Sequence, residues 1–102
     1  MSQKKEIRKR FRDACFMRDK YCCAKCGFKS SKECAEIELD AHHITSRKEM
    51  PNGGYVPENG ISLCAECHIK AEASRLGYSA KELYDIINSN YVKAIKASQK
   101  YQ

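Results

Sequence analysis

Two pairs of cysteines have the C-x-x-C spacing of a metal site: Cys23 with Cys26, and Cys64 with Cys67. Two thiolates at this spacing bind one Zn²⁺ together, and two pairs complete a tetrahedron with no open position. We therefore predict a structural zinc ion, whose binding also helps a short chain to fold. Two alternatives are weighed against it: a redox C-x-x-C pair, whose usual βαβ context is missing, and Cys22 as a ligand in place of Cys23.

The last cysteine pair also belongs to a C-x-x-C-H pattern, which ends at His68 and is typical of c-type haem attachment. Haem attachment needs an exported chain, and the first residues show no secretory signal. It would also leave the first cysteine pair without partners. The total of seven cysteines is odd, which argues against a disulfide framework. We expect Cys15 and Cys34 to be free thiols in a reducing compartment.

All three histidines of the chain, His42, His43 and His68, fall within or beside the segment framed by the cysteine pairs. Because adjacent side chains of a strand point to opposite sides, one of the first two can bind a metal while the other faces a substrate. A strand, a loop and a helix can bring His42 and His68 around one divalent cation, separate from the zinc, with positions open to water and phosphate. The alternative is a histidine beside the zinc and a polar His-His turn. The residues alone leave both interpretations open.

The positions of these residues depend on a predicted succession of short elements. Hydrophobic periodicity and turn residues predict a helix over 4–18, a strand over 36–46, a loop over 47–60, a strand over 61–63 and a helix from Cys64 to Leu76 that Gly77 ends. A capping-box pattern at Ser79 and Glu82 begins a helix that we expect to continue to about Ala97. We interpret it as one structural helix whose apolar side is formed by Leu83, Ile86, Ile87, Tyr91 and Ile95.

The basic charge is concentrated in the N-terminal third of the chain. The 102 residues carry a net charge of +6, but residues 1–32 carry +8 and the remainder −2. In the helix over 4–18, an apolar stripe of Ile7, Phe11 and Ala14 lies beside a basic face made of Lys5, Arg8, Lys9 and Arg12. Such a row fits contacts to a phosphate backbone, or only a solvated helix face. No apolar run is long enough to cross a membrane, so we expect no membrane partner.

Two segments resemble the HNH endonuclease family: Leu-Asp-Ala-His-His-Ile at 39–44, and Pro-Glu-Asn-Gly-Ile-Ser-Leu-Cys-Ala-Glu-Cys-His at 57–68. The resemblance spans about residues 20–75. It implies an α+β fold: a small ββα-metal (His-Me finger) core of two antiparallel strands and a helix. The four-cysteine zinc site staples this core, and helices at about 4–18 and 80–97 flank it. We expect residues 1–102 to form a single domain.

The resemblance also implies roles for individual residues. His43 matches the general base that activates water, and Asn59 matches the asparagine that fixes the loop and orients this base. His42 and His68 match the ligands of one catalytic divalent ion, which stabilises the leaving 3′-oxygen. Glu72 lies one helical turn after His68, and it either completes the metal shell or is an ordinary surface glutamate. Asp40, two residues before His42, can orient a ligand histidine.

The expected function is therefore metal-dependent hydrolysis of DNA phosphodiester bonds. The ion is Mg²⁺, Mn²⁺, Ni²⁺ or Zn²⁺, since histidine ligation suits several metals. We expect low sequence specificity, or specificity from a homodimer or a larger nuclease or packaging partner, in a cytoplasmic protein encoded by a bacterium, a phage or a mobile element. One alternative is a non-catalytic zinc module that binds nucleic acid, which explains neither the paired histidines nor Asn59. Another is a thiol-redox protein.

Overall fold

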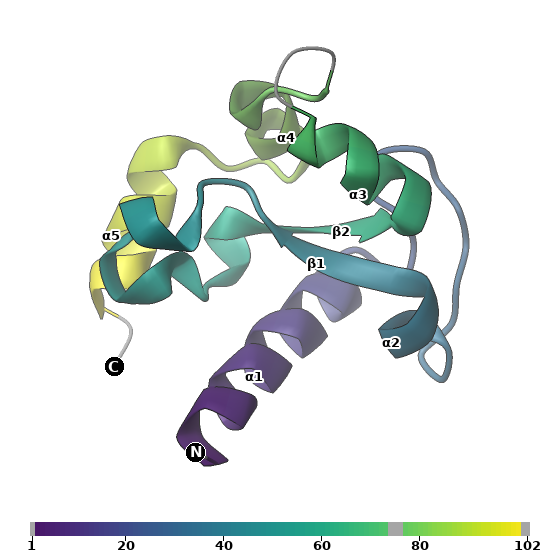
Figure 1. Cartoon of the computed structure of the whole chain (residues 1–102), viewed down its shortest axis with the longest axis horizontal. Coiled ribbons are helices and arrows are strands. Elements are labelled where there is room, and N and C mark those ends of the chain that lie inside the picture. The colour runs from purple at the N-terminus through teal and green to yellow at the C-terminus, as the bar shows by residue number, and fades with distance from the viewer. Residues whose placement is uncertain (1, 74–76, 101–102) are drawn as a thin grey trace.

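Two antiparallel strands lie at the centre of the fold, with α1 on one side and α3 on the other (Figure 1). The computed structural model describes residues 2–73 and 77–100. Its elements are α1 (Ser2–Arg18), α2 (Ala35–Glu38), β1 (Leu39–His43), η1 (Arg47–Glu49), η2 (Pro51–Gly54), η3 (Pro57–Asn59), β2 (Gly60–Cys64), α3 (Ala65–Glu72), α4 (Ala80–Ile86) and α5 (Tyr91–Lys100). None of the described helices combines the length and the apolar character that crossing a membrane requires. The consecutive β1, β2 and α3 form the ββα unit that the resemblance implies.

The sheet pairs β1 with β2 over five residues, from Leu39 opposite Cys64 to His43 opposite Gly60. The prediction that the first strand begins at residue 36 is wrong, because residues 35–38 form the short helix α2. The physical reason lies in β2, which ends at Cys64 and leaves these residues without a strand partner. A helical turn pairs their backbone locally instead, for example through Glu38 N–H to the Cys34 carbonyl at 2.9 Å.

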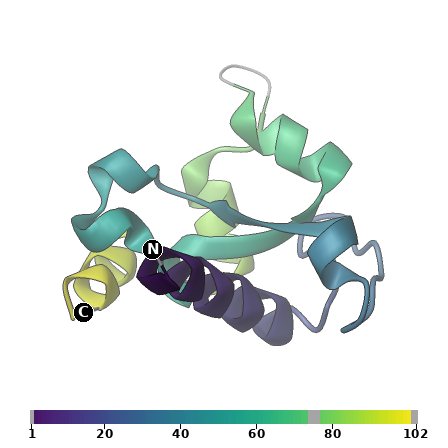
Figure 2. The same ribbon diagram turned by 60° about the horizontal axis from the view of Figure 1, so that its bottom comes forward.

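Helix α1 packs beneath the sheet, as Figure 2 shows. Its buried side chains are Phe11, Cys15 and Phe16. The buried stripe is therefore rotated from the predicted one, although Phe11 belongs to both. The helix approaches the sheet most closely at Gly60, where a Cβ atom would lie 2.5 Å from Cys15 Sγ and 2.6 Å from Phe11 Cζ. Only a glycine leaves room for this packing.

The end of α1 is fixed to the beginning of β2 by polar contacts. Arg18 donates to the Pro57 and Gly60 carbonyls, each at 2.7 Å, and forms an ion pair with Asp19. Asp19 in turn accepts the Ser62 backbone N–H at 2.9 Å. These bonds set the position of α1 relative to the strand that lies opposite the paired histidines.

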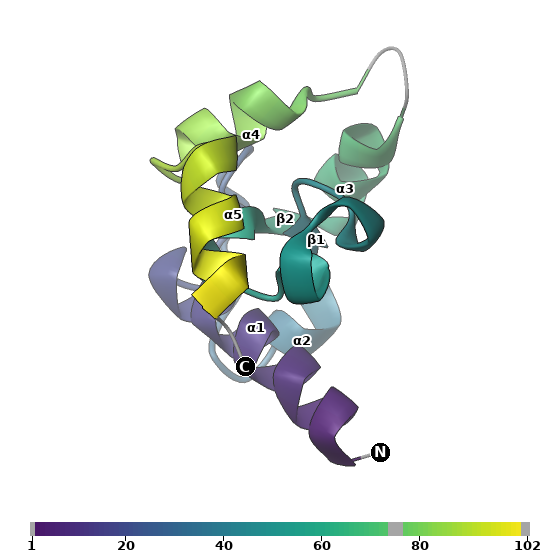
Figure 3. The same cartoon turned by 90° about the vertical axis from the view of Figure 1, so that its left-hand side faces the viewer.

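The C-terminal segment forms two helices, so the prediction of one helix over 80–97 is wrong. Ser79 begins α4, and its hydroxyl accepts the Glu82 N–H at 3.1 Å, which confirms the predicted cap. The chain then turns at Asn88, which has φ 60°, a conformation that asparagine tolerates better than most residues. Asn90 starts α5 by accepting the Lys93 N–H. The two helices run in different directions (Figure 3), and on the predicted apolar side Ile86 and Tyr91 are exposed.

The helix after the second strand covers Ala65–Glu72, a shorter span than predicted, and the predicted stretch 74–76 lies outside the described residues. The predicted loop over 47–60 contains three short 3-10 turns. The hydrophobic core joins the sheet to both flanks, and its fully buried large side chains are Leu39, Ile61, Leu63 and Leu83. The sheet and its two flanks thus share one core, which positions the site.

Candidate active site and zinc centre

The four cysteines predicted to bind zinc come together at one end of the sheet. The sulfur atoms of Cys23, Cys26, Cys64 and Cys67 all lie within 4.8 Å of one another, and Cys26 Sγ is 3.7 Å from Cys64 Sγ. Cys22 lies outside this cluster, with its thiol 3.3 Å from the Lys20 carbonyl. The distances and the donor chemistry fit one tetrahedral Zn²⁺.

Backbone geometry prepares the first cysteine pair for a metal. Cys23 N–H bonds to the Phe28 carbonyl, and Gly27 turns the chain with φ 85°. The Cys26 N–H points at Cys23 Sγ, 3.4 Å away. Burial raises the pKa of Cys23, but hydrogen bonds from the backbone N–H groups of Cys26, Cys64 and Lys25 outweigh it and lower that pKa to about 7. The thiolate is the form that binds metal, so the turn favours the ligating state.

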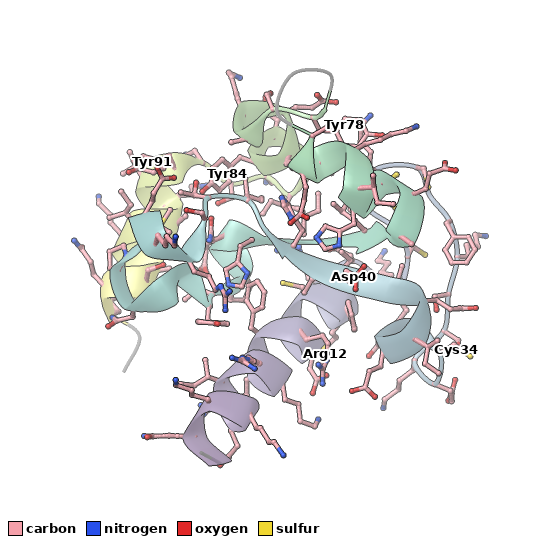
Figure 4. All side chains as sticks on the ribbon, in the orientation of Figure 1. Arg12, Cys34, Asp40, Tyr78, Tyr84 and Tyr91 are labelled. Carbon is pink, nitrogen blue, oxygen red and sulfur yellow. The ribbon has the colours of Figure 1, made fainter. Side chains whose placement is uncertain are left out.

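A groove of about 800 Å³ runs along the free edge of β1, which forms its floor from Leu39 to His43. One wall comes from α1, which contributes Arg8 and Arg12, and the other wall comes from α3. Figure 4 shows Arg12 on α1 and Asp40 on β1. The zinc cluster lies outside this groove, so any chemistry here needs its own donors.

Three side chains in the groove form a second group of metal donors. One ligand atom each of His42, His68 and Glu72 lies within 4.8 Å of the others. The two imidazole rings are 5.2 Å apart, and His68 Nε2 is 3.5 Å from the Glu72 carboxylate. Burial and the neighbouring His68 lower the pKa of His42, which favours its neutral, ligating form. The set suits a divalent cation with positions left for water and phosphate.

Asp40 orients one of these donors. Its carboxylate lies 3.0 Å from Nδ1 of His68. It therefore contacts the histidine of α3 and not His42, its neighbour on the strand. A carboxylate at Nδ1 favours the tautomer that carries the proton there, so the Nε2 lone pair is left for a metal. The structure therefore assigns the orienting role to the histidine of α3, whereas the sequence left open which histidine Asp40 serves.

His43 points to the other side of β1, toward α1. Its ring stacks on Phe11 with a centroid distance of 4.4 Å and meets the edge of Tyr55 at 4.8 Å. Burial, with help from Arg47 and His42, lowers the pKa of His43 to about 4. The imidazole is thus neutral at physiological pH. Its Nε2 is buried without a hydrogen-bond partner in the described part of the chain.

Asn59 is fully buried, and its side chain holds the backbone that follows His43. Its Oδ1 accepts the Thr45 N–H at 3.0 Å, and its Nδ2 donates to the Thr45 and Gly54 carbonyls. Its backbone carbonyl accepts the Ile44 N–H. Asn59 does not line the groove, and its bonds next to His43 are to the backbone of residues 44 and 45.

A residue that sequence analysis missed completes this network. The Tyr84 hydroxyl of α4 donates to Asn59 Oδ1 at 2.7 Å and lies 2.6 Å from Thr45 Oγ1. Arg47 and Tyr55, which flank His43, were missed as well. All three lie in segments where neither spacing nor a motif marks them, and only the tertiary structure brings them to the site.

The predicted basic face of α1 is divided. Arg8 and Arg12 line the groove. Lys9 pairs with Asp13 at 2.7 Å on the exposed helix surface, and Arg12 pairs with Glu36 at 2.8 Å. Lys5 is exposed and does not line the groove. The four residues therefore do not form one uniform surface.

A ββα unit, a four-thiol cluster and a histidine-carboxylate donor set beside a neutral histidine define the class of zinc-stapled ββα-metal proteins. Residues 23–74 match the family model described as HNH endonuclease, and this is half of the chain. The chain belongs to the HNH endonuclease family. No curated protein and no solved structure gives a significant match to it.

Proposed function

We propose that the protein is a metal-dependent endonuclease that hydrolyses phosphodiester bonds of DNA. One observation supports this most strongly: the neutral His43 and the donor set of His42, His68 and Glu72 open onto the same groove from opposite sides of one strand. The family match supports nuclease activity. The net positive charge of residues 1–32 supports a nucleic acid as the partner.

In the proposed reaction, His43 Nδ1 takes a proton from a water molecule as its oxygen attacks phosphorus. The bond from phosphorus to the 3′-oxygen breaks, and solvent returns a proton to that oxygen. The products are a 5′-phosphate and a 3′-hydroxyl. A divalent cation held by His42 and His68, with Glu72 as a third ligand, would supply Lewis acidity to the phosphate and the leaving oxygen. Asn59 keeps His43 in place through residues 44 and 45.

The decisive experiment is relaxation of a supercoiled plasmid by the purified protein, with and without added Mg²⁺ or Mn²⁺. We expect metal-dependent nicking that His43→Ala abolishes. The matched control is Ser46→Ala. Ser46 directly follows Thr45, is exposed and lines the groove, and its variant should retain activity. Zinc content measured for each variant separates loss of chemistry from loss of fold.

A chelation arm tests the second cation. Mild EDTA should abolish nicking while the four-cysteine zinc stays bound, and added Mn²⁺ should restore it. If no preparation cleaves DNA although zinc is bound and DNA binding is tight, the non-catalytic binding module becomes the better hypothesis. Cleavage by His43→Ala at the wild-type rate would contradict the role proposed for the base.

A further inference from the structure

Two arginines converge on one tyrosine beside His43. Arg47 Nη1 donates to the Tyr55 hydroxyl at 3.0 Å, and Arg8 of α1 lies close enough to this hydroxyl to affect its pKa. Burial raises the pKa of Tyr55, but the two guanidinium groups outweigh it and lower that pKa below its ordinary value. The Tyr55 hydroxyl thus lies near two cations that are 39 residues apart in the sequence.

Within residues 2–73 and 77–100, neither Arg8 nor Arg47 forms an ion pair. Their neighbour Arg12 differs, since it is paired with Glu36 at 2.8 Å. With no carboxylate partner among the described residues, both guanidinium groups are available to an anion that enters the groove.

The position of the pair is fixed relative to His43. The Tyr55 ring meets the rings of both His43 and Phe11 edge-on, at 4.8 and 5.7 Å. The turn before it admits only glycine at position 53, which has φ 82° and where a Cβ atom would lie 2.8 Å from Tyr55 Cε2. The side chains of Tyr55, His43 and Phe11 line the groove, together with those of Arg8 and Arg47. The guanidinium groups therefore lie on the base side of β1, opposite the metal donors.

We propose that Arg8 and Arg47 form a subsite for one phosphate of the DNA backbone, and that the Tyr55 hydroxyl orients the Arg47 guanidinium toward it. This inference rests on the proposed function, because the groove must take DNA. The planar guanidinium forks match the non-bridging oxygens of a phosphate. Such a subsite holds the strand on the His43 side of β1, so that the phosphate to be cleaved lies between the base and the metal donors.

The test measures binding without cleavage. A short fluorescent DNA duplex is titrated with zinc-loaded protein, with no added Mg²⁺ or Mn²⁺, at salt concentrations between about 50 and 200 mM. A gel checks that the duplex stays intact. Arg8→Ala and Arg47→Ala are compared with Arg10→Ala and Lys48→Ala. These controls are exposed cations close in sequence that do not line the groove.

We expect Arg8→Ala and Arg47→Ala each to weaken binding about tenfold and to reduce the slope of log K against log salt by about 0.9, the value for one phosphate. The controls should leave the slope unchanged within error. Tyr55→Phe should keep the slope, since no charge is lost, but weaken binding about threefold because the Arg47 guanidinium loses its hydrogen-bond partner.

Equal slope changes for Arg8→Ala and Arg10→Ala, or for Arg47→Ala and Lys48→Ala, would overturn the subsite, because overall charge would then explain binding. Unchanged affinity of Tyr55→Phe would overturn the orienting role of the hydroxyl. These outcomes do not depend on catalysis. A protein that nicks no plasmid but shows the expected slopes contradicts only the proposed function, and one that nicks plasmid with equal slopes contradicts only the subsite.

Discussion

Replacing Tyr84 with phenylalanine tests whether the C-terminal helices stabilise the site. Tyr84 is 4% exposed, and its hydroxyl links Thr45 Oγ1 and Asn59 Oδ1 at 2.6 and 2.7 Å. Phenylalanine keeps the ring and removes only this oxygen. Each buried neutral hydrogen bond contributes about 1 kcal/mol. Two are lost, so we expect the free energy of unfolding to fall by about 2 kcal/mol.

The assay is urea or thermal unfolding at a fixed excess of zinc, since metal binding contributes to the stability. For a domain of this size, the expected loss lowers the melting temperature by about 10 °C. Tyr91→Phe is the matched control, because the Tyr91 side chain is half exposed and its hydroxyl makes no hydrogen bond to any described residue. It should change stability by less than about 0.5 kcal/mol.

Tyr84→Phe should also cleave more slowly than the wild type under conditions in which both proteins are fully folded. Asn59 and Thr45 fix the backbone after His43, and a misplacement of about 1 Å at a reacting group can slow a reaction about 100-fold. We expect the nicking rate of Tyr84→Phe to fall more than that of Tyr91→Phe. If Tyr84→Phe and wild type unfold at the same urea concentration, the network does not stabilise the fold and this reasoning is refuted.

Three further outcomes are expected. Cys64→Ser should lose zinc and cooperative folding, as measured by metal content and circular dichroism, while Cys34→Ser, an exposed thiol outside the cluster, should behave as wild type. Asp40→Asn should weaken Mn²⁺ binding by about 10- to 100-fold in calorimetry, because the proton on His68 Nδ1 loses its carboxylate; unchanged affinity would contradict the orienting role. Gly60→Ala should lower the free energy of unfolding by about 1–3 kcal/mol, because its Cβ collides with buried side chains of α1, and a stability equal to wild type would show that α1 adjusts freely.

The features that the sequence predicted well are those carried by local spacing. The C-x-x-C pairs place their thiols on tight turns, and the four sulfur atoms meet as expected. The alternation around His42 and His43 predicted opposite orientations, and their contacts with His68 and Phe11 agree. The roles of these residues in catalysis stay predictions, since geometry alone does not measure a reaction.

The sequence predictions are wrong or incomplete where tertiary contacts determine the bounds of an element or the neighbours of a side chain. Ile37 fits the alternation of a strand, yet it is 88% exposed in α2, because the partner strand ends too early to pair with it. Ile86 and Tyr91 fit one helical stripe, but the turn at Asn88 separates them into two helices. The contacts of Tyr55 and Tyr84 join segments far apart in the chain. Periodicity contains no information about such pairs.

Two separate sets of contacts position the two sides of the groove. Two of the metal donors, His68 and Glu72, belong to α3, which begins at the cysteine cluster and includes one of its thiols, Cys67. The base faces α1, whose position depends on Gly60 and on the bonds of Arg18. Since β1 carries one histidine toward each side, α3 contacts His42 of the donor set, and α1 contacts His43. In the proposed reaction, the zinc cluster and the α1 contacts would therefore both be needed, one to position the metal donors and the other to position His43.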